Sequence, residues 1–108
     1  MKTYKVKAWG KEYEVSPRVT KYCTDGGLAI VLDYFDEEMQ GWLPYCNLTV
    51  NLGRMNYGFA YVDTNNCPWA TSFIEENGFG KFTGKTCNSG WCEYPLYEFD
   101  MEKLKDAG

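Results

Sequence analysis

Residues 4–15 read Tyr4-Lys5-Val6-Lys7-Ala8-Trp9-Gly10-Lys11-Glu12-Tyr13-Glu14-Val15, and their alternation sets the fold class of the chain. Apolar and polar side chains alternate on both sides of Trp9-Gly10, a two-residue period that is typical of half-buried strands. If Trp9-Gly10 forms a two-residue turn, Val6 lies opposite Tyr13 and Tyr4 opposite Val15 on one face. Lys7 then lies opposite Glu12, and Lys5 opposite Glu14, on the other face. Because one register suits both faces, the stretch predicts an antiparallel hairpin.

Further segments predict strands of the same, mainly antiparallel sheet. We expect Pro17 to end the first hairpin, and the turn signal Asp25-Gly26-Gly27 to join a strand over residues 18–23 to one over 28–32. Residues 28–32 are apolar on both faces, which is typical of a strand in the middle of a sheet. Other strands are predicted over 46–52, 59–62 and 93–99, the last at an edge or bulge because it contains Pro95. Residues 79–90, rich in glycine, are expected to form a loop.

One amphipathic helix is predicted near residues 66–77. Asn65-Asn66-Cys67-Pro68 is a favourable helix start, and Gly78 is suited to the left-handed position that ends a helix. Its apolar side, formed by Trp69, Phe73 and Ile74, needs a sheet face to pack against. A short terminal helix over 101–105, capped by Asp100, is also expected. The sequence therefore predicts a single α+β domain over residues 1–108, with a sheet of five or six strands and one packed helix near 66–77.

The composition argues against several functional classes. The net charge of −4 is unevenly distributed, because residues 23–80 hold eight acidic residues and one arginine, a net −7. Such a segment repels nucleic acid, which is bound through clustered cations. No apolar run approaches the length of a membrane span, and the first residues do not resemble a signal peptide. We therefore expect a cytoplasmic protein with no nucleic-acid partner and no membrane partner.

Catalytic and metal-binding motifs are not apparent. The chain has no histidine, the commonest general base at neutral pH, and its five cysteines include one close pair, whereas a four-cysteine zinc site usually has two. An odd number of cysteines without a secretion signal predicts reduced thiols, with a disulfide between Cys87 and Cys92 as the alternative. The sequence thus predicts a non-enzymatic protein with no catalytic, cofactor or metal site.

Cys67 is the one candidate reactive thiol. It would lie in the first turn of the predicted helix, where the helix dipole lowers the pKa of a thiol. A small buried apolar group is the simpler interpretation, since free cysteines usually behave in this way. A thiol-based redox protein that uses Cys67 is therefore an alternative hypothesis.

Aromatic residues make up 18% of the chain, more than one small core is expected to hide, and exposed aromatic side chains anchor protein interfaces. This favours a binding or regulatory protein with an unknown protein partner. The alternative is that the aromatic side chains simply fill the core. A second alternative is an acidic anti-defence protein that mimics the charge of DNA, with Asp33, Glu75 and Glu76 extending the acidic surface. The candidate interface residues are Trp42, Trp91, Asp36, Glu37 and Glu38.

Several segments of the C-terminal half resemble one known family. They are residues 47–52, the segment 61–69 with its Asn65-Asn66-Cys67-Pro68-Trp69 core, residues 73–78, and residues 90–97 with Phe99. They are similar to a domain-of-unknown-function family of short cytosolic proteins from Gram-positive gut bacteria, often found on integrative or conjugative elements. The resemblance implies an accessory protein of a mobile element. It implies no site residue, because the family has no established activity.

Overall fold

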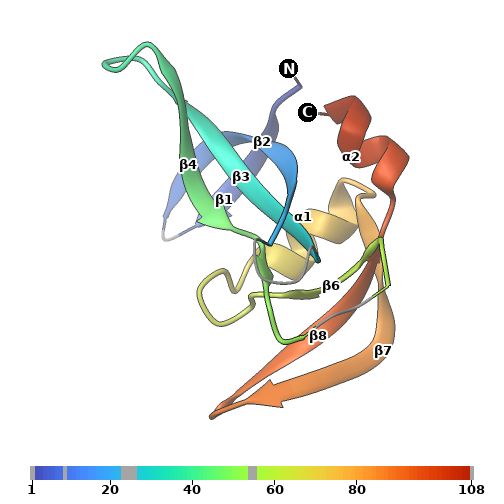
Figure 1. Ribbon diagram of the computed structural model, residues 1–108. Helices are drawn as coiled ribbons and strands as arrows, with labels where there is room; N and C mark the ends of the chain where they lie inside the picture. Colours follow the sequence, from blue (N-terminus) through green and yellow to red (C-terminus); the bar gives the residue numbers. More distant parts are fainter. Residues whose placement is uncertain (1, 9, 23–26, 54–55, 108) are drawn as a thin grey trace.

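The computed structural model describes residues 2–8, 10–22, 27–53 and 56–107. Within them, eight strands form two antiparallel sheets of four, and two short helices complete an α+β fold (Figure 1). The first sheet has the order β1-β2-β3-β4 and the second the order β5-β6-β8-β7. The α+β class is confirmed, but the strands divide between two sheets instead of joining in one of five or six. The bounds are β1 Tyr4–Ala8, β2 Lys11–Lys21, β3 Leu28–Asp36, β4 Gly41–Asn47, β5 Thr49–Val50, β6 Phe59–Val62, α1 Ala70–Glu76, β7 Gly80–Ser89, β8 Cys92–Phe99 and α2 Met101–Ala107.

Leu48 is the point at which the two sheets separate. Its amide donates to the carbonyl of Ile30 in β3 at 2.9 Å, and its carbonyl accepts from the amide of Asp63 at 2.9 Å. The chain thus leaves the first sheet and joins the second within one residue. This division replaces the single strand predicted over 46–52.

The predicted hairpin register is confirmed between β1 and β2. Tyr4 pairs with Val15, Lys5 with Glu14, Val6 with Tyr13 and Lys7 with Glu12. The side chains of Val6 and Val15 are buried, whereas Lys5 and Lys7 are exposed, so the two faces separate as their alternation requires. Trp9, Asp25 and Gly26, from the two predicted turns, lie outside the described residues.

Pro17, Pro44 and Pro95 all lie inside strands of the structure. The break expected at Pro17 is wrong. The edge or bulge expected for residues 93–99 is a bulge, because Pro95 lies at the irregularity of the β7–β8 ladder between Phe82 and Thr86. Strand β2 continues through Pro17, and β8 runs through Pro95 between β6 and β7. The pairing of β1 with β2 begins at Tyr4 and Val15, and that of β6 with β8 ends at Tyr61 and Leu96. Pro17 and Pro95 therefore each lie just past the last residue pair with one neighbouring strand, where the missing N–H is no loss to the sheet.

Helix α1 begins at Ala70, four residues after the predicted start. Asn66 does not cap it, because its backbone and side-chain amides donate to the Asp63 carboxylate at 3.1 and 2.9 Å. The Asp63 carboxylate holds residues 64–66 in a turn ahead of the helix. Cys67 therefore lies before α1 and not in its first turn.

Strand β7 occupies the segment that was predicted as a glycine-rich loop. Gly80 lies so close to β8 that a Cβ there would meet the carbonyl oxygen of Glu98 at 2.8 Å. Gly84 has φ +90° and lies where the β7–β8 register shifts between Phe82 and Thr86. Both glycines therefore serve the strand pairing, one through close approach and one at an irregularity of the ladder.

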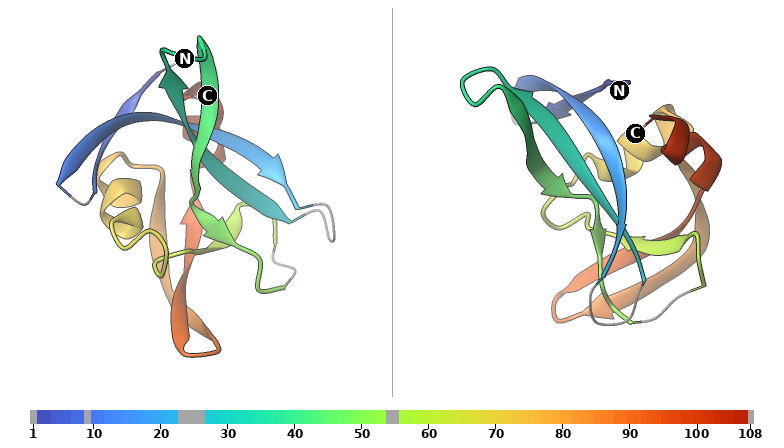
Figure 2. Two further views of the ribbon diagram at one scale, coloured as in Figure 1. Left: turned by 90° about the vertical axis from the view of Figure 1, so that its left-hand side faces the viewer. Right: turned by 45° about the horizontal axis from the view of Figure 1, so that its top comes forward.

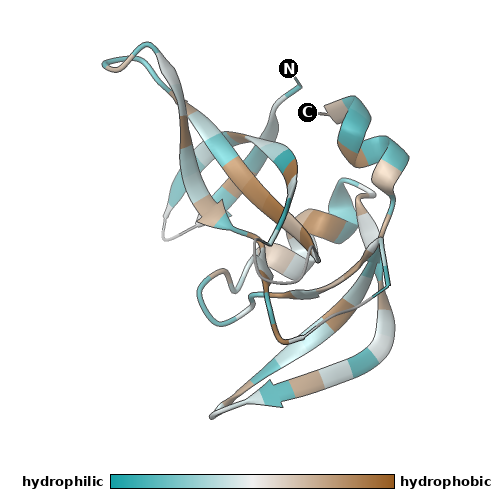
Figure 3. Cartoon of the chain, in the orientation of Figure 1, coloured by the Kyte–Doolittle hydropathy of each residue, from teal (hydrophilic) through white to brown (hydrophobic). Residues whose placement is uncertain are grey.

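The core is a single cluster to which both sheets and both helices contribute. Helix α1 lies between the two sheets (Figure 2), and its buried Phe73 and Ile74 pack in this cluster, as predicted. Figure 3 shows apolar residues concentrated on β3 and α1, where these layers meet. The core thus joins residues from β1 to α2 in one contiguous unit.

Helix α2 brings the two ends of the chain together. The Asp100 carboxylate accepts the amide of Lys103 at 3.1 Å, so the predicted cap is confirmed, and the helix extends to Ala107. The amide of Lys2 donates to the carbonyl of Ala107 at 3.2 Å, and the Lys2 ammonium contacts Asp106 at 2.7 Å. Both ends therefore lie on one side of the molecule (Figure 1).

Candidate functional site

The far end of the β3–β4 hairpin, residues 35–42, projects from the body of the molecule (Figure 1). We call it the β3–β4 tip. Phe35 and Trp42 are paired across the two strands, with ring centroids 5.7 Å apart in an edge-to-face arrangement. They remain 46% and 37% exposed, and Met39 in the turn is 69% exposed. Three large apolar side chains are thus presented to solvent on one hairpin.

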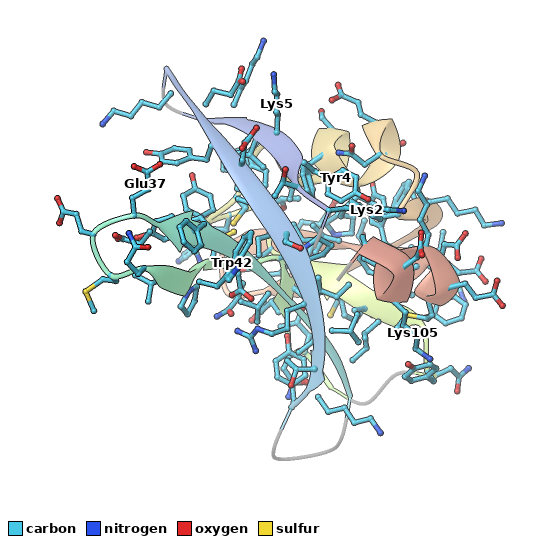
Figure 4. All side chains as sticks on the ribbon, turned by 90° about the horizontal axis from the view of Figure 1, so that it is seen from above. Lys2, Tyr4, Lys5, Glu37, Trp42 and Lys105 are labelled. Atoms are coloured by element: carbon cyan, nitrogen blue, oxygen red, sulfur yellow. The ribbon has the colours of Figure 1, made fainter. Side chains whose placement is uncertain are left out.

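The turn of the tip is held by its own polar groups. One oxygen of the Asp36 carboxylate accepts the amides of Glu38 and Met39 at 2.9 and 3.1 Å. Gln40 has φ +53°, uncommon for a residue with a side chain, and its amide group donates to the carbonyl of Glu37. The Asp36 carboxylate therefore holds the turn, while Glu37 and Glu38 are exposed. Figure 4 shows Glu37 at the tip, on the same hairpin as Trp42.

Trp91 lies at the opposite end of the molecule, in the turn between β7 and β8 (Figure 1). Its side chain is fully exposed, and Gly90 beside it has φ +61°, which a tight turn requires. The structure therefore brings Trp42 together with Asp36, Glu37 and Glu38, but separates Trp91 from them.

The carboxylates of the charge-mimic hypothesis do not form one surface. Asp33 is 6% exposed and accepts two hydrogen bonds from the Arg18 guanidinium, at 2.8 and 3.3 Å. The bond to Asp33 raises the pKa of Arg18. Glu75 on α1 accepts the hydroxyl of Tyr97 at 2.9 Å, and α1 lies away from the β3–β4 tip (Figures 1 and 4). Asp33 is thus paired with Arg18, and both Glu75 and Glu76 lie on α1, so these carboxylates do not extend the acidic tip.

Cys67 is covered by the core and contacts a second thiol. Its side chain is 2% exposed and donates to the carbonyl of Asn47 at 3.8 Å. A hydrogen bond with Cys46 lowers the pKa of Cys67, while burial and Asp63 act in the opposite direction. The same bond, together with burial, raises the pKa of Cys46. The sequence did not predict this pair, because the two cysteines come together only through the turn of the chain at Leu48.

Cys87 and Cys92 lie on neighbouring strands but not opposite each other. Cys87 faces Tyr94 and Cys92 faces Ser89 in the β7–β8 ladder. Both are free thiols, as are Cys46 and Cys67. In the described part of the chain, no group of three or more cysteine and acidic side chains has the arrangement of a metal site. Among the same residues, no helix is both long enough and apolar enough to cross a membrane.

Residues 17–107 match a domain of unknown function, DUF4313. The chain belongs to the DUF4313 family. No curated protein matches the chain, and no solved structure does. The DUF4313 segment includes the β3–β4 tip, the Cys46–Cys67 pair and Trp91, whereas β1 precedes it.

A series of neighbouring aromatic rings runs through the core from β2 to α1. Tyr45 lies between Tyr13 and Trp69, with ring centroids 4.8 and 6.2 Å away, and Trp69 continues to Phe73 at 5.9 Å. These ring contacts place part of the aromatic excess inside the protein. Of the tryptophans in the described residues, Trp69 therefore belongs to the packing, while Trp42 and Trp91 are left at the surface.

Proposed function

We propose that this protein is a non-enzymatic binding or regulatory protein that docks a partner protein through its β3–β4 tip. The observation that carries the proposal is the exposed Phe35–Trp42 pair, which lies on the same hairpin tip as the two exposed acidic residues Glu37 and Glu38. Burial of a large aromatic side chain by a partner gains more free energy than burial of a smaller one, and such residues commonly dominate the binding energy of an interface. The matching surface is an apolar pocket with lysine or arginine at its rim.

The cellular setting we propose is an accessory role for a mobile element, in the cytoplasm. This setting rests on the resemblance to short proteins of integrative or conjugative elements. The free thiols of Cys46, Cys67, Cys87 and Cys92 suit a reducing compartment.

A thiol-based redox protein using Cys67 is the second candidate, and the lowered pKa of Cys67 beside the Cys46 thiol favours it. Burial of Cys67 opposes it, because a thiolate must meet its substrate. Alkylation followed by mass spectrometry decides the matter. A Cys67 that reacts at neutral pH no faster than a peptide thiol removes this candidate.

The docking proposal is tested by affinity purification from the native host after chemical crosslinking. The wild-type chain is compared with the double variant Phe35→Ser/Trp42→Ser, and the matched control is Trp91→Ser at the other exposed tryptophan. We expect a co-eluting protein that is lost from the double variant by at least roughly tenfold, as for an interface hot spot. The control is expected to retain it.

Glu37→Gln/Glu38→Gln is expected to slow association and to weaken its dependence on salt, because exposed charges act mainly on the encounter rate. Circular dichroism checks that each variant is folded. A partner that is kept by the tip variant and lost by Trp91→Ser would place the interface at the β7–β8 turn. Finding no protein enriched over the tip variant would also contradict the proposal.

A further inference from the structure

A groove with a volume of about 450 Å³ runs between β1 and α1. One wall is formed by residues 5–7 of β1, and the other by Trp69, Ser72, Phe73 and Glu76. Figure 4 shows Tyr4 and Lys5 on β1 beside α1. The volume is within the range of about 300–1,000 Å³ that is usual for ligand-binding sites.

Strand β1 is an edge of the first sheet. It pairs with β2 on one side, and within the described residues no strand pairs with its other side. The backbone N–H and C=O groups along such an edge are a template for one more strand. The five residues of β1 span about 17 Å, at about 3.4 Å per residue. The groove therefore offers backbone hydrogen bonds along one wall and side-chain contacts along the other.

The alternation of side chains along β1 determines which side chains would suit each face of an added strand. The side chain of Val6 is buried, and Tyr4 packs on Phe79 with ring centroids 4.8 Å apart, so these two residues face the core. Lys5 and Lys7 point to the opposite, exposed face. Side chains of neighbouring strands alternate in step, so every second residue of an added strand would face the apolar side of the groove, and the others would lie beside the lysines.

The hairpin itself already displays this pattern. On its inner side, β1 pairs with Glu12-Tyr13-Glu14-Val15, in which carboxylates alternate with apolar side chains, and Lys5 contacts Glu12 at 3.4 Å. Lys5 is still 68% exposed in this ion pair and can meet a second carboxylate from the other side. On the far wall of the groove, the carboxylate of Glu76 disfavours acidic side chains there and leaves that side to apolar ones.

We propose that β1 and α1 form a peptide-binding groove, which takes an extended segment of a partner protein as an added strand whose apolar residues alternate with Asp or Glu. A second copy of this chain is a poor occupant, because pairing β1 with β1 sets lysines against lysines, and like charges on adjoining strands are destabilising. The groove lies at the β1 edge of the first sheet, and the β3–β4 tip at the β4 edge. The two binding proposals are therefore independent and can fail separately.

The test uses three fluorescent peptides of about seven residues and measures fluorescence anisotropy. The first alternates Glu with Val, the second has Lys in place of each Glu, and the third is the first with alternate backbone amides methylated. We expect the Glu peptide to bind, and the Lys peptide to bind at least roughly tenfold more weakly, because each cross-strand charge pair changes from attraction to repulsion. The methylated peptide is expected not to bind. Amide hydrogen exchange should slow in residues 4–8 when the Glu peptide is present.

Two variants locate the site. Lys5→Glu/Lys7→Glu is expected to reverse the preference between the Glu and Lys peptides, whereas Lys85→Glu/Lys105→Glu, with the same change of charge at exposed positions, should keep it. Ser72→Trp fills the groove from an exposed position of α1 and should abolish binding. The Phe35→Ser/Trp42→Ser variant of the tip should bind the peptide normally. The proposal is overturned if neither the Glu peptide nor the Lys peptide binds, or if these two bind equally. It is also overturned if binding of the Glu peptide is unchanged in both Lys5→Glu/Lys7→Glu and Ser72→Trp.

Discussion

Tyr97 connects β8 to α1 through its phenol group, which donates a hydrogen bond to the Glu75 carboxylate at 2.9 Å. The side chain is 2% exposed. Burial and this hydrogen bond raise the pKa of Tyr97 from 10.0 to about 12. The folded protein therefore holds the phenol proton more tightly than the unfolded chain does. The stability that this contributes is fully present below about pH 10 and is lost as the pH rises toward about 12.

We expect Tyr97→Phe to flatten the alkaline loss of stability. Between about pH 9 and about pH 12, the wild type should lose on the order of 2 kcal/mol of unfolding free energy more than the variant, because the variant has no phenol to titrate. Urea unfolding at several pH values measures the difference. Tyr57→Phe, at a position that is 59% exposed, is the control and should follow the wild type. Parallel curves for the wild type and Tyr97→Phe would contradict the assignment.

Sequence reasoning reached part of the candidate site at this scale. Trp42 and its acidic neighbours were found because they are close in sequence and the hairpin keeps them together. Their distance from Trp91, and the contact between Cys46 and Cys67, depend on how whole strands are placed in space. No local pattern encodes such placement, so these relations required the structure.

Among the elements, the β1–β2 hairpin was predictable because two faces had to agree in one register. Strand β7 was not, since its glycines resemble those of a loop while serving close approach and an irregular ladder. The start of α1 was missed because the Asp63 carboxylate competes for the amides of Asn66. In these cases, partners from outside the segment overrode the local propensity.

Helix α2 packs on β2, and its Leu104 is 1% exposed and belongs to the core cluster. We expect Leu104→Ala to lower the free energy of unfolding by about 2–5 kcal/mol, the range found when a buried leucine leaves a cavity. The exposed neighbour Lys105→Ala is the control and should change it by less than about 0.5 kcal/mol. Chemical denaturation measures both. Equal effects of the two substitutions would show that α2 contributes little to the core.

At the scale of the whole molecule, the two sheets share one core, which includes Val6 and Val15 from the first sheet and Val62 and Tyr97 from the second. We therefore expect residues 1–108 to unfold as a single cooperative unit. Far-UV circular dichroism and tryptophan fluorescence should give the same urea midpoint. Two separate midpoints would instead indicate that each sheet unfolds on its own, and would overturn the single-domain prediction.

The hydrogen bond between Lys2 and Ala107 has a practical consequence for measurement. The amide nitrogen of Lys2 and the carbonyl oxygen of Ala107 are 3.2 Å apart. Two dyes attached next to these residues would therefore be close together while the protein is folded. An unfolded chain of this length has a radius of gyration of about 30 Å, so the dyes would move far apart on denaturation. Energy transfer between the ends would then follow folding in single molecules, without labels on the β3–β4 tip or in the groove beside β1.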